Sequence, residues 1–163
     1  MSDSTKRRYP QWIVLIGFLL AVAVIAGAGS LFTSTGVSAW YRQLTRPSWT
    51  PPDWLFGPVW TVLYISMAVA VWLVWRRCIP RSRWAIGVWF LQLLLNGAWY
   101  PIFFGLHSIG GGLITIALLW LAILATVGIF WSVSRAAAIL MLPYLAWVTF
   151  ASCLNLALWK LNP

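Results

Sequence analysis

Five apolar stretches dominate the pattern of hydrophobic and polar positions along this chain of 163 residues. Each is about as long as the roughly 20 residues that a helix needs to cross the hydrocarbon core of a bilayer. The short alternating segments of a membrane β-barrel are not seen, so helices are the form in which these stretches satisfy their backbone in lipid. The sequence therefore predicts an all-α integral membrane protein with one domain over 1–163. The predicted spans are approximately 12–32, 55–75, 84–105, 112–131 and 136–159.

Composition agrees with a multi-pass membrane protein. Apolar residues make up 62% of the chain and charged residues 8%, and the mean hydropathy is +0.86, which leaves too few charges to solvate a soluble surface. The net charge of +9 could suggest a nucleic-acid partner. However, the basic residues lie at the ends of apolar runs instead of forming a stripe on a solvated fold, so we expect no nucleic-acid binding.

The basic residues also predict the orientation. Three of the eleven, Arg42, Arg46 and Lys160, fall on one side of the predicted spans. The other eight are Lys6, Arg7, Arg8, Arg76, Arg77, Arg81, Arg83 and Arg135. Because cytoplasmic loops carry the excess of Lys and Arg, we predict a cytoplasmic N-terminus, with the 33–54 loop outside.

An alternative for the first span is a cleaved secretory signal. Lys6, Arg7 and Arg8 precede an apolar run, and Ala26-Gly27-Ala28 resembles a cleavage site with small residues. The run is longer than a usual signal and continues through Leu31, which favours a permanent helix.

Polar and aromatic residues recur on one face of three spans. Steps of three and four residues keep helical side chains on the same face. These faces are Trp60, Tyr64, Met67 and Val71 in the second span, Gln92, Asn96, Trp99 and Phe103 in the third, and Tyr144, Trp147, Ala151 and Asn155 in the fifth. Since polar side chains at membrane depth are costly, they face a partner helix or a cavity.

The amides of Gln92, Asn96 and Asn155 therefore have two interpretations: they join helices together, or they line a ligand site. Pro101 and Pro143 lie inside spans beside these faces and are expected to kink their helices. Kinked helices that carry aromatic and small residues leave room for a ligand, so we predict an internal pocket.

The loop at 33–54 contains the segment WYRQLTRPSWTPPDW at 40–54. Its prolines restrict φ and reduce the entropy lost when the loop becomes ordered. We predict that the loop is a stiff lid over the pocket, with bulky surface supplied by Trp40, Tyr41, Trp49 and Trp54. The alternative is an interfacial anchor, with the same aromatic rings among lipid headgroups.

The charged residues of the loop have candidate roles as well. Arg42 and Arg46 could meet a lipid phosphate or the carboxylate of a ligand that enters the pocket. Asp53 is expected to cap the turn that starts at Trp54.

Four motifs resemble the translocator protein family, also called tryptophan-rich sensory protein, TspO/MBR or peripheral-type benzodiazepine receptor, in its bacterial form. They are WYxxLxRPSWTPP at 40–52, GPVWTVLY at 57–64, QLLLNGAWYPIFFG at 92–105 and PYLAWVTFASCLN at 143–155. The motifs occur in order and cover most of the chain from Trp40 onward.

The resemblance implies a five-helix, usually dimeric membrane protein that binds porphyrins and hydrophobic drug-like ligands under the first loop. Carried over by motif, the pocket includes Tyr41, Trp49, Trp60, Asn96, Trp99, Trp147 and Ala151. Light-dependent breakdown of bound protoporphyrin, known in some bacterial members, would fall to Trp60 and Trp147. Sterol binding is in doubt because Leu154–Lys160 lacks the tyrosine of the animal recognition pattern.

Conventional catalysis is not predicted. The spans contain no Asp or Glu, and the only histidine, His107, lies in a short connection, which makes it a weak candidate for a haem ligand. No metal site and no required cofactor are expected. The complete predicted ligand set is Tyr41, Arg46, Trp49, Trp60, Tyr64, Gln92, Asn96, Trp99, Phe103, Tyr144, Trp147 and Ala151.

The same pocket could serve a receptor or sensor, a light-dependent porphyrin-degrading activity, or a transporter of porphyrins or other lipophilic molecules. The expected partners are a porphyrin or other hydrophobic molecule, the lipid bilayer and a second copy of the chain.

Overall fold

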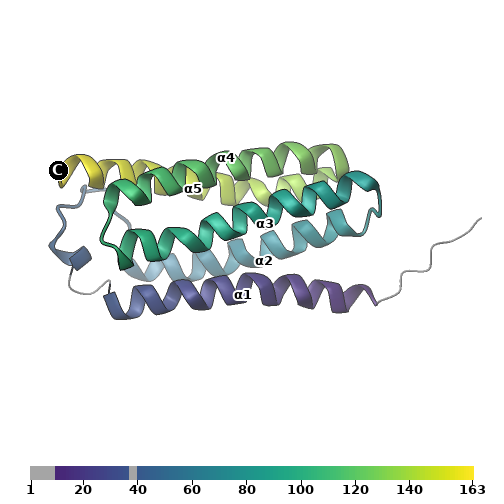
Figure 1. Cartoon of the computed structure of the whole chain (residues 1–163), viewed down its shortest axis with the longest axis horizontal. Coiled ribbons are helices and arrows are strands. Elements are labelled where there is room, and N and C mark those ends of the chain that lie inside the picture. Colours follow the sequence, from purple (N-terminus) through teal and green to yellow (C-terminus); the bar gives the residue numbers. More distant parts are fainter. Residues whose placement is uncertain (1–9, 37–39) are drawn as a thin grey trace, which may run out of the picture.

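Five long helices make up most of the computed structural model, which describes residues 10–36 and 40–163 (Figure 1). They are α1 (Gln11–Gly36), α2 (Phe56–Trp75), α3 (Pro80–Tyr100), α4 (Ile109–Val133) and α5 (Arg135–Leu161). Each helix contains a segment long and apolar enough to cross a membrane. The prediction of an all-α bundle with five spans is confirmed.

The helix ends differ from the predicted ends by a few residues. Helix α1 continues to Gly36, so residues 33–36 of the predicted lid are helical. Residues 37–39 lie outside the described part of the chain. Helix α3 begins at Pro80, four residues before the predicted start. Proline suits the first helical position because its missing N–H has no partner there in any helix.

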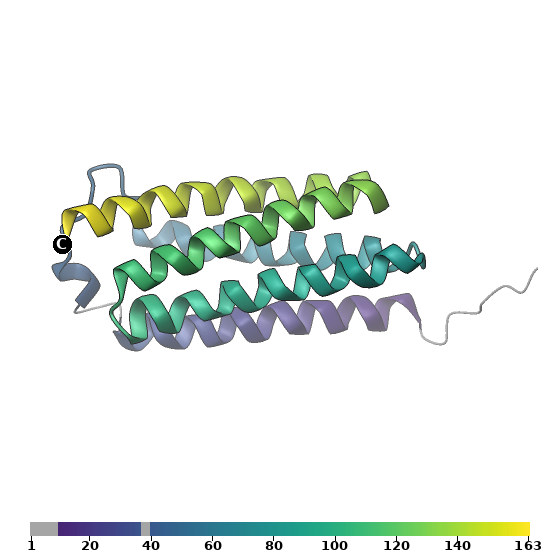
Figure 2. The same cartoon turned by 45° about the horizontal axis from the view of Figure 1, so that its top comes forward.

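The helices form a ring whose order is not the order of the sequence. Helix α2 packs between α1 and α5, α4 packs between α5 and α3, and α3 closes the ring against α1. Figures 1 and 2 show that the carboxyl terminus and the loop before α2 lie at one end of the bundle. The turns that join α2 to α3 and α4 to α5 lie at the other end. The ring brings α2, α3 and α5, which carry the three predicted polar faces, around a common interior.

The two internal prolines have different effects. The α-helix α3 ends at Tyr100, and residues Pro101–Gly105 form a short π-helix, η3, in which the Leu106 amide donates to the Pro101 carbonyl at 2.9 Å. Helix α5 continues through Pro143. Pro101 thus changes the type of helix beside the interior, where the sequence predicted a kink.

The loop before α2 is attached to the bundle end. Asn162, after α5, accepts a hydrogen bond from the Thr45 amide at 2.9 Å and donates to the Thr45 carbonyl at 3.1 Å. A 3-10 turn, η2 (Asp53–Leu55), then leads into α2. Asp53 is the first residue of this turn; Pro52 occupies the capping position, and no side chain caps it. The predicted capping role of Asp53 is therefore wrong.

Candidate functional site

A cavity of about 870 Å³ lies between the helices, and Tyr41 and Asp53 from the loop contribute to its wall. Described residues of all five helices line the rest of it. Its volume falls within the roughly 300–1,000 Å³ typical of small-molecule sites.

Eight of the twelve predicted ligand-binding residues line this cavity. They are Tyr41, Trp60, Tyr64, Asn96, Trp99, Phe103, Trp147 and Ala151. Six of the eight lie on α2, α3 and α5, and their helical spacing explains the convergence, because the helix ring turns the three faces toward one another.

Two predicted residues lie below or behind the cavity. Gln92 is fully buried, does not line the cavity, and neither atom of its amide has a hydrogen-bond partner among the described residues. It lies one helical turn deeper than Asn96, about 6 Å along the axis. Tyr144 is also fully buried and stands behind Trp60, with 6.1 Å between ring centroids.

Two predicted loop residues lie outside the cavity lining. Trp49 packs edge-on against Phe150 with centroids 5.7 Å apart, and 48% of its surface is exposed. Arg46 points to Asp53, with 3.9 Å between Nη1 and Oδ1. Tyr41 therefore lines the cavity while Trp49 remains exposed at the bundle end, and the two predicted roles of the loop, lid and interfacial anchor, stay predictions.

Stacked rings form much of the cavity wall. Trp60 stacks on Tyr64 with centroids 5.2 Å apart and an angle of 30° between the planes. Trp99 stacks on Phe103 at 4.7 Å and 16°. Trp147 lies edge-on to Phe56 at 5.7 Å. Such packed rings present rigid flat surfaces, which suit a flat hydrophobic ligand.

The polar groups of the cavity also join the helices. The Tyr64 hydroxyl donates to Asn96 Oδ1 at 2.7 Å, and Asn96 Nδ2 donates to the Tyr144 hydroxyl at 3.0 Å, which links α2, α3 and α5. Trp99 Nε1 donates to Asn155 Oδ1 at 3.3 Å. Since Asn96 and Asn155 both line the cavity, these two residues fit both interpretations offered by the sequence.

Tyr41 connects the loop to the cavity. Its ring lies edge-on to Phe103 and Phe104, with centroid distances of 6.4 and 5.9 Å. The Arg46 guanidinium lies 5.5 Å from the ring centroid. Burial raises the pKa of the Tyr41 phenol, and the positive charge of Arg46 acts in the opposite direction. The phenol is therefore neutral and able to donate a hydrogen bond over the physiological pH range.

Sequence reasoning missed the contribution of α1 and of Asp53. Six residues of α1 line the cavity: Leu19, Val22, Ala23, Ala26, Gly29 and Ser30. The first span is apolar except for Ser30 near its end, so no stripe of polar residues marked its inner face. The available signal in the sequence was the small side chains of Ala23, Ala26 and Gly29.

The chemistry of the site favours binding. Asp53, at the rim, is the one charged residue among the described residues that line the cavity. The part of the chain described by the structure contains no cluster of three or more His, Cys, Asp or Glu that could hold a metal. His107 does not line the cavity and instead stacks on Trp40 with centroids 4.7 Å apart. The lining residues thus offer flat apolar surfaces and a few hydrogen-bonding groups.

Comparisons with known proteins agree with the motifs. A family model described as "TspO/MBR family" matches residues 17–160. A tryptophan-rich protein TspO of Chlorobaculum tepidum is 45% identical, over 91% of this chain and 93% of the relative. Protein CrtK of Rhodobacter capsulatus is 39% identical, over 90% and 91% of the two chains. The human translocator protein is 40% identical, over 94% and 92%.

Proposed function

Because the chain belongs to the TspO/MBR family, we propose that it is a membrane receptor or sensor that binds porphyrins and other flat hydrophobic ligands in the aromatic cavity. The observation that carries the proposal is the aromatic wall: a cavity of about 870 Å³ has Trp60, Trp99 and Trp147 along its sides. A porphyrin is a flat apolar disc with two carboxylates, so its faces match indole rings and its polar edge matches the wet rim.

A spectral titration of the purified protein with protoporphyrin IX in the dark tests this proposal. We expect saturable quenching of tryptophan fluorescence together with a shift of the porphyrin absorption band. Trp147→Ala removes one aromatic wall and is expected to weaken binding about tenfold, since ring contacts of this kind contribute on the order of 1 kcal/mol beyond the area they bury.

Trp84→Ala is the matched control. Trp84 lies in the first turns of α3, away from the cavity, and 79% of its surface is exposed. Equal affinities of the Trp147→Ala and Trp84→Ala proteins would contradict the proposed site.

The same titration under illumination tests the light-dependent activity proposed for Trp60 and Trp147. Both indoles line the cavity and are electron-rich partners for an excited porphyrin. Porphyrin absorbance is expected to disappear faster with the protein than with free porphyrin, and more slowly with a Trp60→Phe/Trp147→Phe variant. Equal rates for the two proteins would reject a role of these indoles while leaving binding intact.

We also infer that the protein spans the cell membrane with its N-terminus in the cytoplasm. The arginines at 76, 77, 81, 83 and 135 lie in, or in the first helical turn after, the two connections at one end of the bundle, which supports this orientation. Cys78 is exposed in the turn after α2. In a Cys153→Ser variant, a maleimide that cannot cross membranes should label Cys78 in inverted vesicles and leave it unlabelled in right-side-out vesicles. The reverse pattern would overturn the orientation.

A further inference from the structure

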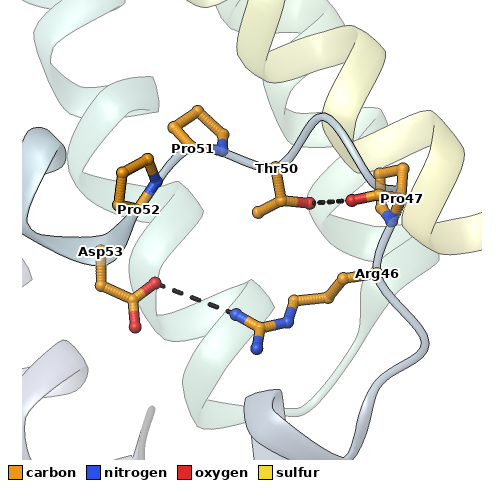
Figure 3. Close-up of a pocket in the computed structure, with 6 residues that line it drawn as sticks. All are labelled: Arg46, Pro47, Thr50, Pro51, Pro52 and Asp53. Atoms are coloured by element: carbon orange, nitrogen blue, oxygen red, sulfur yellow. Dashed lines mark hydrogen bonds and ion pairs between the residues drawn. The ribbon is translucent and has the colours of Figure 1, made fainter.

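Arg46 lies in the loop before α2 and points toward Asp53, as Figure 3 shows. Its guanidinium lies 3.9 Å from the Asp53 carboxylate and 5.5 Å from the centre of the Tyr41 ring. Both Asp53 and Tyr41 line the cavity, whereas Arg46 does not. The positive charge is therefore one side chain away from the interior, behind the Asp53 carboxylate and the Tyr41 ring.

Asp53 also lines a second hollow. An outer depression of about 540 Å³ is lined by Arg46, Pro47, Thr50, Pro51, Pro52 and Asp53. Asp53 is the one described residue that lines both spaces. A molecule that passes between the depression and the cavity would move past this carboxylate.

The backbone around the ion pair is held more firmly than the pair itself. The Thr50 amide and hydroxyl both donate to the Pro47 carbonyl, at 3.1 and 2.8 Å, and three prolines restrict the same segment. The ion pair is longer than a charge-assisted hydrogen bond, and its side chains are 36% and 78% exposed for Arg46 and Asp53. Exposed ion pairs of this kind are weak, so another carboxylate can replace Asp53 without disturbing the loop.

We propose that Asp53 is a specificity-determining residue. Its carboxylate pairs with Arg46 until an anionic ligand binds, and the carboxylate of the ligand then replaces it at the guanidinium. The proposal rests on the proposed function, because it assigns the ligand's polar edge to the rim of the same cavity. A carboxylate that approaches Arg46 more closely gains a charge-assisted and bidentate hydrogen bond. A ligand without a carboxylate gains nothing from the exchange. Arg46 and Asp53 therefore favour the binding of ligands that carry a carboxylate over ligands that lack one.

The test compares protoporphyrin IX with its dimethyl ester, which keeps the ring and lacks both acid groups. Binding of the two porphyrins to the full chain is measured in the dark for wild type, Asp53→Asn, Arg46→Gln and the double variant. The readout is the ratio of the diacid affinity to the ester affinity, which cancels effects on the apolar part of the cavity. Arg46→Lys serves as the conservative variant that keeps the charge.

We expect Asp53→Asn to raise this ratio about fivefold, because the competing carboxylate is removed. Arg46→Gln is expected to lower the ratio by a similar factor, and Arg46→Lys to lower it less because it keeps a point charge without the bidentate geometry. In the Arg46→Gln background, Asp53→Asn should not change the affinity ratio further, because the guanidinium with which Asp53 competes for the ligand is absent.

Three results would overturn the exchange while leaving the cavity as a porphyrin site. The first is an unchanged ratio in Asp53→Asn. The second is an effect of Asp53→Asn that persists in the Arg46→Gln background, which would mean simple repulsion of the ligand by Asp53. The third is an unchanged ratio in Arg46→Gln. Failure of both porphyrins to bind the wild-type protein would instead overturn the proposed function, and the exchange with it.

Discussion

Replacement of Gly112 by alanine is expected to destabilise the protein and to weaken ligand binding together. A Cβ atom at this position of α4 would lie 2.6 Å from Phe103 Cδ2 and 3.1 Å from Asn155 Oδ1. Neither neighbour is free to move away, because Phe103 is held between the rings of Trp99 and Trp40 and Asn155 Oδ1 accepts from Trp99. The added methyl group would therefore strain the packing of α4 against Phe103 and Asn155, which both line the cavity.

The size of the effect follows from two opposing contributions. Overpacking of a tight interior costs about 1–3 kcal/mol in the free energy of unfolding. Alanine is better than glycine in a helix by about 1 kcal/mol, which offsets part of that cost. We expect a net loss that is visible as a lower unfolding midpoint in detergent, and a porphyrin affinity reduced in parallel.

Gly128→Ala in the same helix is the matched control. A Cβ atom at Gly128 would meet no atom within 4 Å, so only the gain in helix propensity remains. This variant should be as stable as the wild type or slightly more stable, with unchanged binding. If Gly112→Ala behaved in the same way as Gly128→Ala, the close packing between α4 and Phe103 would be contradicted.

The helical faces of α2, α3 and α5 were predictable because each contains residues that are costly in lipid. The spacing of Trp60 and Tyr64, and of Asn96 and Trp99, decides which way each helix faces. The limit of this reasoning is depth along the helix. Gln92 shares the face of Asn96 but lies one turn below the cavity floor, and periodicity reports the direction of a side chain without reporting where a cavity ends.

The contributions of α1 and of the loop depend on packing that no local pattern specifies. Gly29 of α1 approaches the Tyr100 ring so closely that a Cβ atom there would lie 2.8 Å from it. That contact depends on the ring order of the helices, in which α1 meets both α2 and α3. Similarly, Asp53 had the residue type and position of a helix cap, yet its carboxylate faces Arg46, seven residues earlier in the loop. A cap is a local prediction, and the ion pair depends on how the whole loop folds back.

Replacement of Asn96 by leucine is expected to have the largest effect on stability among the substitutions considered. Asn96 accepts from the Tyr64 hydroxyl and donates to the Tyr144 hydroxyl, and all three residues are buried. Leucine has a similar size and cannot pair with either hydroxyl. Each buried polar group that loses its partner costs about 1–3 kcal/mol, and values measured between membrane helices lie toward the lower end. The free energy of unfolding should therefore fall by about 2–4 kcal/mol, measured by denaturation in mixed micelles.

A triple variant separates lost hydrogen bonds from altered packing. Tyr64→Phe and Tyr144→Phe, added to Asn96→Leu, remove the two hydroxyls that paired with Asn96 while they keep both rings in place. Because replacement of all partners by apolar groups is close to neutral, the triple variant should recover most of the stability lost by Asn96→Leu alone. No recovery would mean that leucine fails through its shape, and the hydrogen-bonded link between α2, α3 and α5 would not be what holds the cavity floor. Recovery, in contrast, would show that the hydrogen bonds of Asn96 with Tyr64 and Tyr144 hold the inner end of the cavity together. A ligand that reaches Asn96 must then compete with these two tyrosines for its amide.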